Sequence, residues 1–179
     1  MRQSMTRKAL IKSRLLATTV ALAIGLGSSV TRAAENTVLG IYNVWIAQTY
    51  SQLDQNVCMM WSQPEQAEGD YTTRGDIYVF LSHRPGEQRR NEIRFEAGYN
   101  FKDESRVTVT IDEKVFTLAT DTSTAWLTSS ADEQAMVSAM KAGRDMRVEG
   151  TSSRGTATTD TYSLYGFSAA YKAIGKACS

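Results

Sequence analysis

The chain has 179 residues, 42% of them hydrophobic and 22% charged, and a formal net charge of +1 at pH 7. Residues 2–32 hold six of its 20 Lys and Arg residues and none of its 19 Asp and Glu residues, so the remainder carries 14 basic against 19 acidic residues, a net charge of −5. Because the remainder lacks the basic surface that nucleic-acid binding needs, no nucleic-acid partner is expected.

The beginning of the chain has the three parts of a secretory signal peptide. Basic residues precede an apolar run over residues 15–26, and small residues follow it. The run is shorter than the roughly 20 apolar residues that a membrane-spanning helix needs. We expect Sec-type export and cleavage after Ala33 or one residue later, which removes residues 1–33. Residues 34–179 are then one domain with no transmembrane segment, in the periplasm, at the outer membrane or secreted.

The chain has two cysteines, Cys58 and Cys178. In an exported protein they predict one disulfide, and only one pairing is possible. This bond would enclose nearly the whole domain in one covalent loop. A reactive thiol at Cys178 is the less favoured alternative, because Lys172 and Lys176 lie only loosely near it in the sequence.

A series of short strands is predicted after the signal peptide. They are expected over residues 41–50, 56–61, 76–82, 91–98, 106–112 and 115–120, around Trp126, and over 146–149 and 158–164, with a polar loop over 65–74. Apolar and polar residues alternate in 91–98 and 106–112, which is typical of antiparallel strands covered on one face. The sequence therefore predicts a mainly β fold, an antiparallel β-sandwich with two short peripheral helices.

The first predicted helix begins at a capping box over residues 130–133, in which Ser130 caps the helix and Glu133 reaches back, and it stops at Gly143. The second lies at the end of the chain. Its apolar residues are three or four positions apart, so they share one face: Phe167, Ala170, Tyr171, Ile174 and Cys178.

His83 is the only histidine, and it limits the possible catalytic sites. A Ser–His–Asp triad would have to combine it with members of one set: Ser152, Ser153, Ser163, Asp76 and Asp160. No G-x-S-x-G motif supports this, so we interpret His83 as part of a polar turn at a strand end, with a hydrolase as the less favoured alternative. One histidine and two paired cysteines are too few for a zinc site. No catalytic residue, metal or cofactor is expected.

Two arginines, Arg74 and Arg154, each precede a glycine at the start of a predicted strand. They either belong to an anion- or partner-binding edge or pair with Asp76 and Asp160, and we favour pairing. The interaction surface is expected on loops, since sandwiches usually carry function there. The candidate loops are 62–75, 83–91 and 150–160, and the candidate contact residues on them are Arg74, His83, Arg84 and Arg154.

Distributed segments of the chain resemble the invasion-associated locus B family of exported alphaproteobacterial proteins. The segments are CMMWSQP (58–64), TRGDIYVFLSHRP (73–85), GYNF (98–101), VFTL (115–118), TAW (124–126) and MVSAMKAGRDMRVEGTSSRGTATTDTYSLYGFSAAYKAI (136–174), with Cys178. The resemblance implies a periplasmic or outer-membrane-associated β-sandwich without a known catalytic site, linked in pathogenic members to virulence through host-cell, notably erythrocyte, invasion. Many members carry further cysteines near the N-terminal Trp and in the middle segment, which this chain lacks.

Export, the predicted disulfide, the sandwich and the resemblance together favour a non-enzymatic envelope protein. It would mediate a protein or host-cell-surface interaction, with a partner and an oligomeric state that the sequence does not define. A periplasmic envelope-maintenance or chaperone-like protein is the alternative, and it differs only in its partner.

Overall fold

The computed structural model describes residues 36–179, so the predicted signal peptide lies outside the described residues. The described chain forms eleven strands and two α-helices. The strands are β1 (Thr37–Tyr42), β2 (Trp45–Gln52), β3 (Gln55–Ser62), β4 (Gln66–Gly69), β5 (Tyr78–Arg84), β6 (Arg89–Glu96), β7 (Val107–Ile111), β8 (Lys114–Asp121), β9 (Thr124–Trp126), β10 (Asp145–Thr151) and β11 (Ala157–Ser163). The helices are α1 (Ser130–Ala142) and α2 (Phe167–Ala177), and a 3₁₀ turn, Pro85–Glu87, joins β5 to β6.

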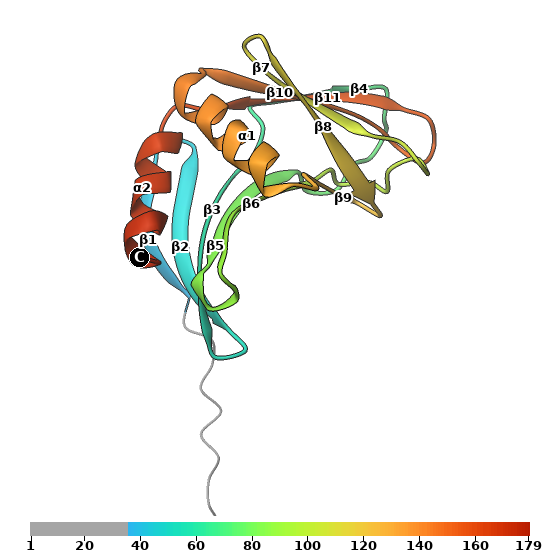
Figure 1. Cartoon of the computed structure of the whole chain (residues 1–179). Helices are drawn as coiled ribbons and strands as arrows, with labels where there is room; N and C mark the ends of the chain where they lie inside the picture. Colours follow the sequence, from blue (N-terminus) through green and yellow to red (C-terminus); the bar gives the residue numbers. More distant parts are fainter. Residues whose placement is uncertain (1–35) are drawn as a thin grey trace, which may run out of the picture. The chain divides into compact units, whose positions relative to one another are not determined.

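All eleven strands belong to one antiparallel sheet, in the order β1-β2-β3-β5-β6-β9-β8-β7-β10-β11-β4, with β1 and β4 at its free edges. The prediction of a mainly antiparallel β fold with two helices is confirmed. The sheet bends, so that its two halves pack on one core (Figure 1). One half contains β1, β2, β3, β5 and β6, and the other contains β7, β10, β11 and β4. Phe95 on β6 and Tyr162 on β11 meet across this core, with ring centres 6.3 Å apart. The two layers are therefore parts of one bent sheet rather than separate sheets.

The first predicted strand, residues 41–50, is in fact part of a hairpin. The chain turns at Asn43, which has a φ of +56°, and β1 then pairs with β2. Asparagine enters this left-handed region more readily than most residues. The turn is hidden in the sequence because β-branched and aromatic residues continue on both sides of it.

The predicted polar loop over residues 65–74 contains a short edge strand, β4. All four of its residues are exposed, and it pairs only with β11. An exposed strand has no alternation of apolar residues to reveal it. Only its pairing with a strand some 90 positions later in the chain defines it.

Helix α1 is capped by Ser129, so the predicted cap at Ser130 is wrong by one residue. The Ser129 side chain accepts a hydrogen bond from the Asp132 amide over 3.1 Å. Both serines have an acidic residue three positions later, so spacing alone did not distinguish them. One face of this helix is apolar and buried: Met136, Val137 and Met140.

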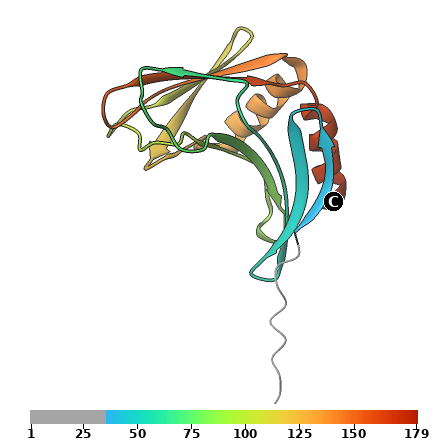
Figure 2. The same ribbon diagram turned by 180° about the vertical axis from the view of Figure 1, so that it is seen from behind.

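Helix α2 packs against the N-terminal strands (Figure 2). The Phe167 ring meets the Trp45 ring edge to face, with centres 5.1 Å apart. Just beyond the helix, Cys178 forms the predicted disulfide with Cys58 on β3, and their Cα atoms are 6.0 Å apart. The predicted apolar face and the predicted disulfide are both confirmed. Within residues 36–179, no helix is both long and apolar enough to cross a membrane.

Candidate ligand-binding cleft

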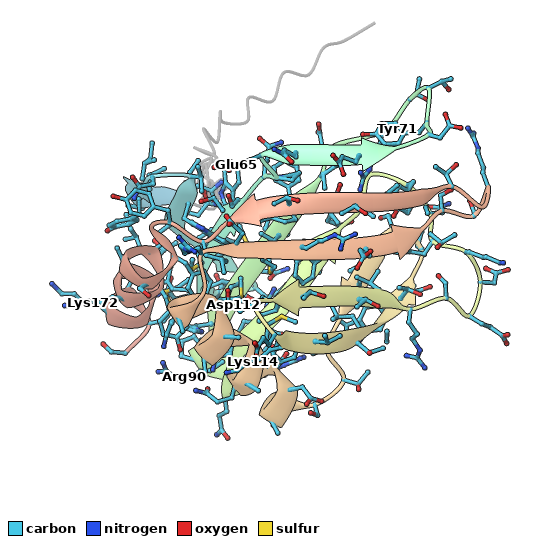
Figure 3. The ribbon with its side chains drawn as sticks, turned by 90° about the horizontal axis from the view of Figure 1, so that it is seen from above. Glu65, Tyr71, Arg90, Asp112, Lys114 and Lys172 are labelled. Carbon is cyan, nitrogen blue, oxygen red and sulfur yellow. A yellow bond between two sulfur atoms is a disulfide. The ribbon has the colours of Figure 1, made fainter. Side chains whose placement is uncertain are left out.

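A cleft of about 650 Å³ opens where three loop segments meet, residues 70–75, 98–100 and 152–158. We call it the polar cleft. The first and third segments belong to two of the predicted interaction loops, 62–75 and 150–160. Figure 3 shows Tyr71 just after β4, at the same end of the sheet as the turn between β10 and β11. Pairing of β4 with β11 brings these loops together.

Arg74, which lines the polar cleft, forms a buried ion pair with Asp160 behind the lining. The guanidinium donates from Nη1 and Nη2 to the two carboxylate oxygens, each over 2.6 Å, and the side chains are only 4% and 5% exposed. Its Nε donates to the Ala97 carbonyl over 2.7 Å. Arg74 therefore pairs with Asp160 and not with Asp76, the acidic residue nearest to it in the sequence. The predicted pairing role is correct, but its partner lies 86 positions away.

Two tyrosine rings enclose the Arg74 guanidinium, with ring centres 5.5 Å away for Tyr71 and 4.9 Å away for Tyr99. The Tyr71 hydroxyl donates to the Ala67 carbonyl over 2.9 Å, and the Tyr99 and Thr158 hydroxyls are 2.6 Å apart. Burial raises the pKa of Tyr99, so its phenol stays protonated. The aromatic walls are thus held in fixed orientations.

The ionisation of the pair depends on the balance between its burial and the bonds between the two side chains. Burial tends to lower the pKa of Arg74, but its bonds to Asp160 outweigh this and raise the pKa, so the guanidinium stays charged. Burial raises the pKa of Asp160, and the Arg74 bonds oppose that rise. The charge of Arg74 is therefore neutralised within the protein.

Backbone contacts fix the other two segments. The Gly75 amide donates to the Gly98 carbonyl over 2.9 Å, and the Ser153 amide donates to the Asn100 carbonyl over 2.7 Å. Gly98 has a φ of +71°, and a Cβ there would collide with the Gly75 carbonyl oxygen. Glycine is therefore required at position 98 for the close approach of these two loops.

The third predicted loop, 83–91, does not line the polar cleft. Arg84 donates from Nε to Glu92 over 2.9 Å and from Nη1 to Gln52 over 2.7 Å. Figure 3 places Arg90, from the same loop, on the side away from Tyr71. Of the four candidate contact residues, the cleft brings together Arg74 and Arg154, and only Arg154 is exposed.

His83 lies inside β5 and is 1% exposed, so its predicted place in a polar turn is wrong. It is opposite Cys58 in the sheet, and its ring meets Tyr171 of α2 edge to face. The Asn91 amide donates to its Nδ1 over 3.2 Å, and the Ser82 carbonyl oxygen is 3.1 Å from that nitrogen. His83 lies on the inward-facing side of β5, and for this reason its side chain is buried.

The serine and aspartate candidates for a catalytic triad do not hydrogen-bond to His83 in the described residues. Within residues 36–179, the His83 ring hydrogen-bonds to backbone atoms alone, while Asp160 is held by Arg74 and the Ser152 hydroxyl accepts from the Thr156 amide. In that part of the chain, no three His, Cys, Asp or Glu side chains are grouped to hold a metal ion.

Burial of His83 predicts an acid-sensitive fold. Burial lowers its pKa below the ordinary 6.5, helped by the charges of Arg90 and Lys141, although Ser82 opposes the shift. Because the pKa of His83 is lower in the folded state, the unfolded chain binds more protons than the folded chain once the pH falls below about 6.5. The contribution of the neutral imidazole to the free energy of unfolding is therefore fully present above that pH and is lost as the pH drops. Melting temperatures measured from pH 8 to 5 should fall more steeply for the wild type than for His83→Gln. Melting temperatures that fall in parallel for the two proteins would show that His83 does not contribute to the acid sensitivity.

One protein-family model, described as Invasion associated locus B (IalB) protein, matches residues 45–175. The chain belongs to the IalB family. A comparison with curated proteins and a comparison with solved structures each found no match. The matched region contains every residue that lines the polar cleft, whereas β1 and Cys178 lie outside it.

Part of the polar cleft of this IalB-family chain could not be identified from its sequence. The sequence does not show that Tyr71, Tyr99 and the 98–100 loop lie beside Arg74. The GYNF segment (98–101) entered only through the family resemblance. A glycine followed by an aromatic residue directly after an alternating strand is the one local signal, and it does not show which loop lies opposite.

Proposed function

We propose that this IalB-family chain is an exported, non-enzymatic envelope protein that holds a protein or cell-surface partner at the polar cleft. The observation that carries this proposal is the meeting of loops 62–75 and 150–160 around the Arg74–Asp160 pair. Loops on a rigid β scaffold are the usual location of binding sites in such folds.

The geometry favours binding over chemistry. The polar cleft is preformed, since the ion pair and the two amide-to-carbonyl bonds join its walls. His83, the residue on which a hydrolase would depend, is buried under α2 and does not line the cleft. A fixed cleft loses little conformational entropy when a partner binds.

Binding of the fluorescently labelled mature chain to cells tests this proposal. The targets are intact cells of a producing bacterium, cells whose outer membrane has been opened, and mammalian cells. We expect Arg154→Glu and Ser153→Trp to reduce binding about tenfold, because both side chains are exposed at the cleft and neither stabilises the fold. Melting temperatures should stay unchanged.

Arg106→Glu is the matched control, since Arg106 is exposed but does not line the cleft. Binding only to opened cells would favour the envelope-maintenance or chaperone-like role, and binding to mammalian cells would favour a host-surface role. Equal binding by the wild type and both cleft variants would contradict the use of the cleft.

A further inference from the structure

We propose that the polar cleft binds an uncharged saccharide, as the end or a short segment of a glycan chain. This inference rests on the proposed function, because it names the chemical class of partner that the cleft would hold. The glycan could belong to the bacterial envelope or to a host cell, and both sources present the same hydroxyl-rich chemistry.

Most of the side chains that line the cleft are polar. Fourteen residues line it, and none has an aliphatic side chain; the only rings are those of Tyr71 and Tyr99. Ligand pockets for apolar molecules and for apolar side chains are lined mainly by hydrophobic residues. A ligand that is itself polar around its whole perimeter therefore fits this lining better than a hydrophobic molecule or an apolar peptide side chain.

The charges of the cleft balance. Arg74 is neutralised by Asp160, which leaves one exposed acid, Asp70, and one exposed base, Arg154, in the lining. Binding sites for phosphate or sulfate gather several cationic donors, and cation sites gather several carboxylates. The polar cleft offers neither, so its electrostatics favour a neutral ligand.

Several neutral side chains are free to bind such a ligand. Five lining residues make no side-chain hydrogen bond to other residues in the described part of the chain: Thr72, Thr73, Asn100, Ser153 and Thr156. A hydroxyl or a primary amide both donates and accepts. Neighbouring hydroxyls of a sugar ring also donate and accept, so each can meet a matching group on the wall.

The cleft also has a suitable wall and size. The face of an aromatic ring carries negative potential, which attracts the weakly positive C–H groups on the flat side of a sugar ring. Tyr71 is half-buried, and its hydroxyl bond to Ala67 fixes the ring at the cleft. A volume of about 650 Å³ lies within the range of small-molecule sites and admits more than one sugar ring.

The test is an array of defined probes applied to the mature protein, with dissociation constants then measured by calorimetry. The probes are neutral oligosaccharides of hexoses and N-acetylhexosamines, sulfated and sialylated oligosaccharides, a peptidoglycan-derived disaccharide, and end-capped peptides. We expect the neutral sugars to bind and the double variant Thr72→Val/Asn100→Leu to bind them at least about tenfold more weakly, since it removes polar groups at little change in volume.

The control is Thr117→Val, an exposed threonine on β8 outside the cleft, which should bind like the wild type. Preference for the peptidoglycan disaccharide or for host-type sugars would identify the source. Binding of only the anionic sugars or only the peptides at the cleft would overturn the saccharide inference and leave the proposed function standing. No binding of any probe, combined with cell binding that the cleft variants do not weaken, would overturn both.

Discussion

Removing the disulfide with Cys58→Ala and Cys178→Ala is expected to lower the free energy of unfolding by about 4–5 kcal/mol. The bond joins residues 120 positions apart, so it restricts almost the whole unfolded chain. The chain-entropy description relates the stabilisation to the length of that loop. Chemical denaturation of the double variant and of the wild type measures the difference.

Helix α2 should remain in place without the disulfide, because Phe167, Ala170 and Ile174 are fully buried. The variant is therefore expected to fold, with a lower denaturation midpoint. The wild type under reducing conditions serves as the second comparison and should match the variant. A loss below about 1 kcal/mol in both would contradict the entropic account, whose expected range begins well above that value.

Substituting Arg74→Met is expected to destabilise the fold by about 3–5 kcal/mol, since it leaves the buried Asp160 carboxylate without its partner. Arg74 is thus a buried structural residue, although the sequence also made it a candidate contact residue on an interaction loop. The double substitution Arg74→Met/Asp160→Leu should regain most of the loss, because replacing both members of a buried pair with apolar residues is often nearly neutral.

The exposed pair Arg147–Glu149 supplies the matched control. Its side chains are 57% and 40% exposed, so Arg147→Met should change the free energy of unfolding by only about 0–1 kcal/mol. Urea denaturation of the four proteins separates the two cases. If the double variant is no more stable than Arg74→Met, the loss does not come from an unpaired buried charge.

Features that depend on local spacing or on residue type alone are predictable from the sequence. The apolar face of α2 follows from spacing within one helix, and the disulfide follows from the presence of two cysteines in a chain with a predicted export signal. The alternating strands β6 and β7 were recognised because one face of each is buried. The turn at Asn43 was missed because no break in composition marks it.

The polar cleft depends on contacts between distant parts of the chain, and for that reason it was only partly predictable. Arg74 was a candidate, but the sequence could not show that its partner is Asp160 rather than the nearby Asp76. Edge strand β4, which brings the two loops together, has no apolar pattern of its own. The predicted strand over 76–82 places His83 in the turn that follows it, whereas the observed strand continues through His83 to Arg84.

The most direct test of the account is an NMR titration of isotopically labelled protein comprising residues 34–179 with the neutral oligosaccharide that binds it most tightly. We predict that the amide shifts change in residues 70–75, 98–100 and 152–158 and that the rest of the domain is little affected, because the cleft is preformed. Shifts concentrated instead on loop 83–91 or on α2, with the cleft unchanged, would contradict the claim that the polar cleft is the binding site.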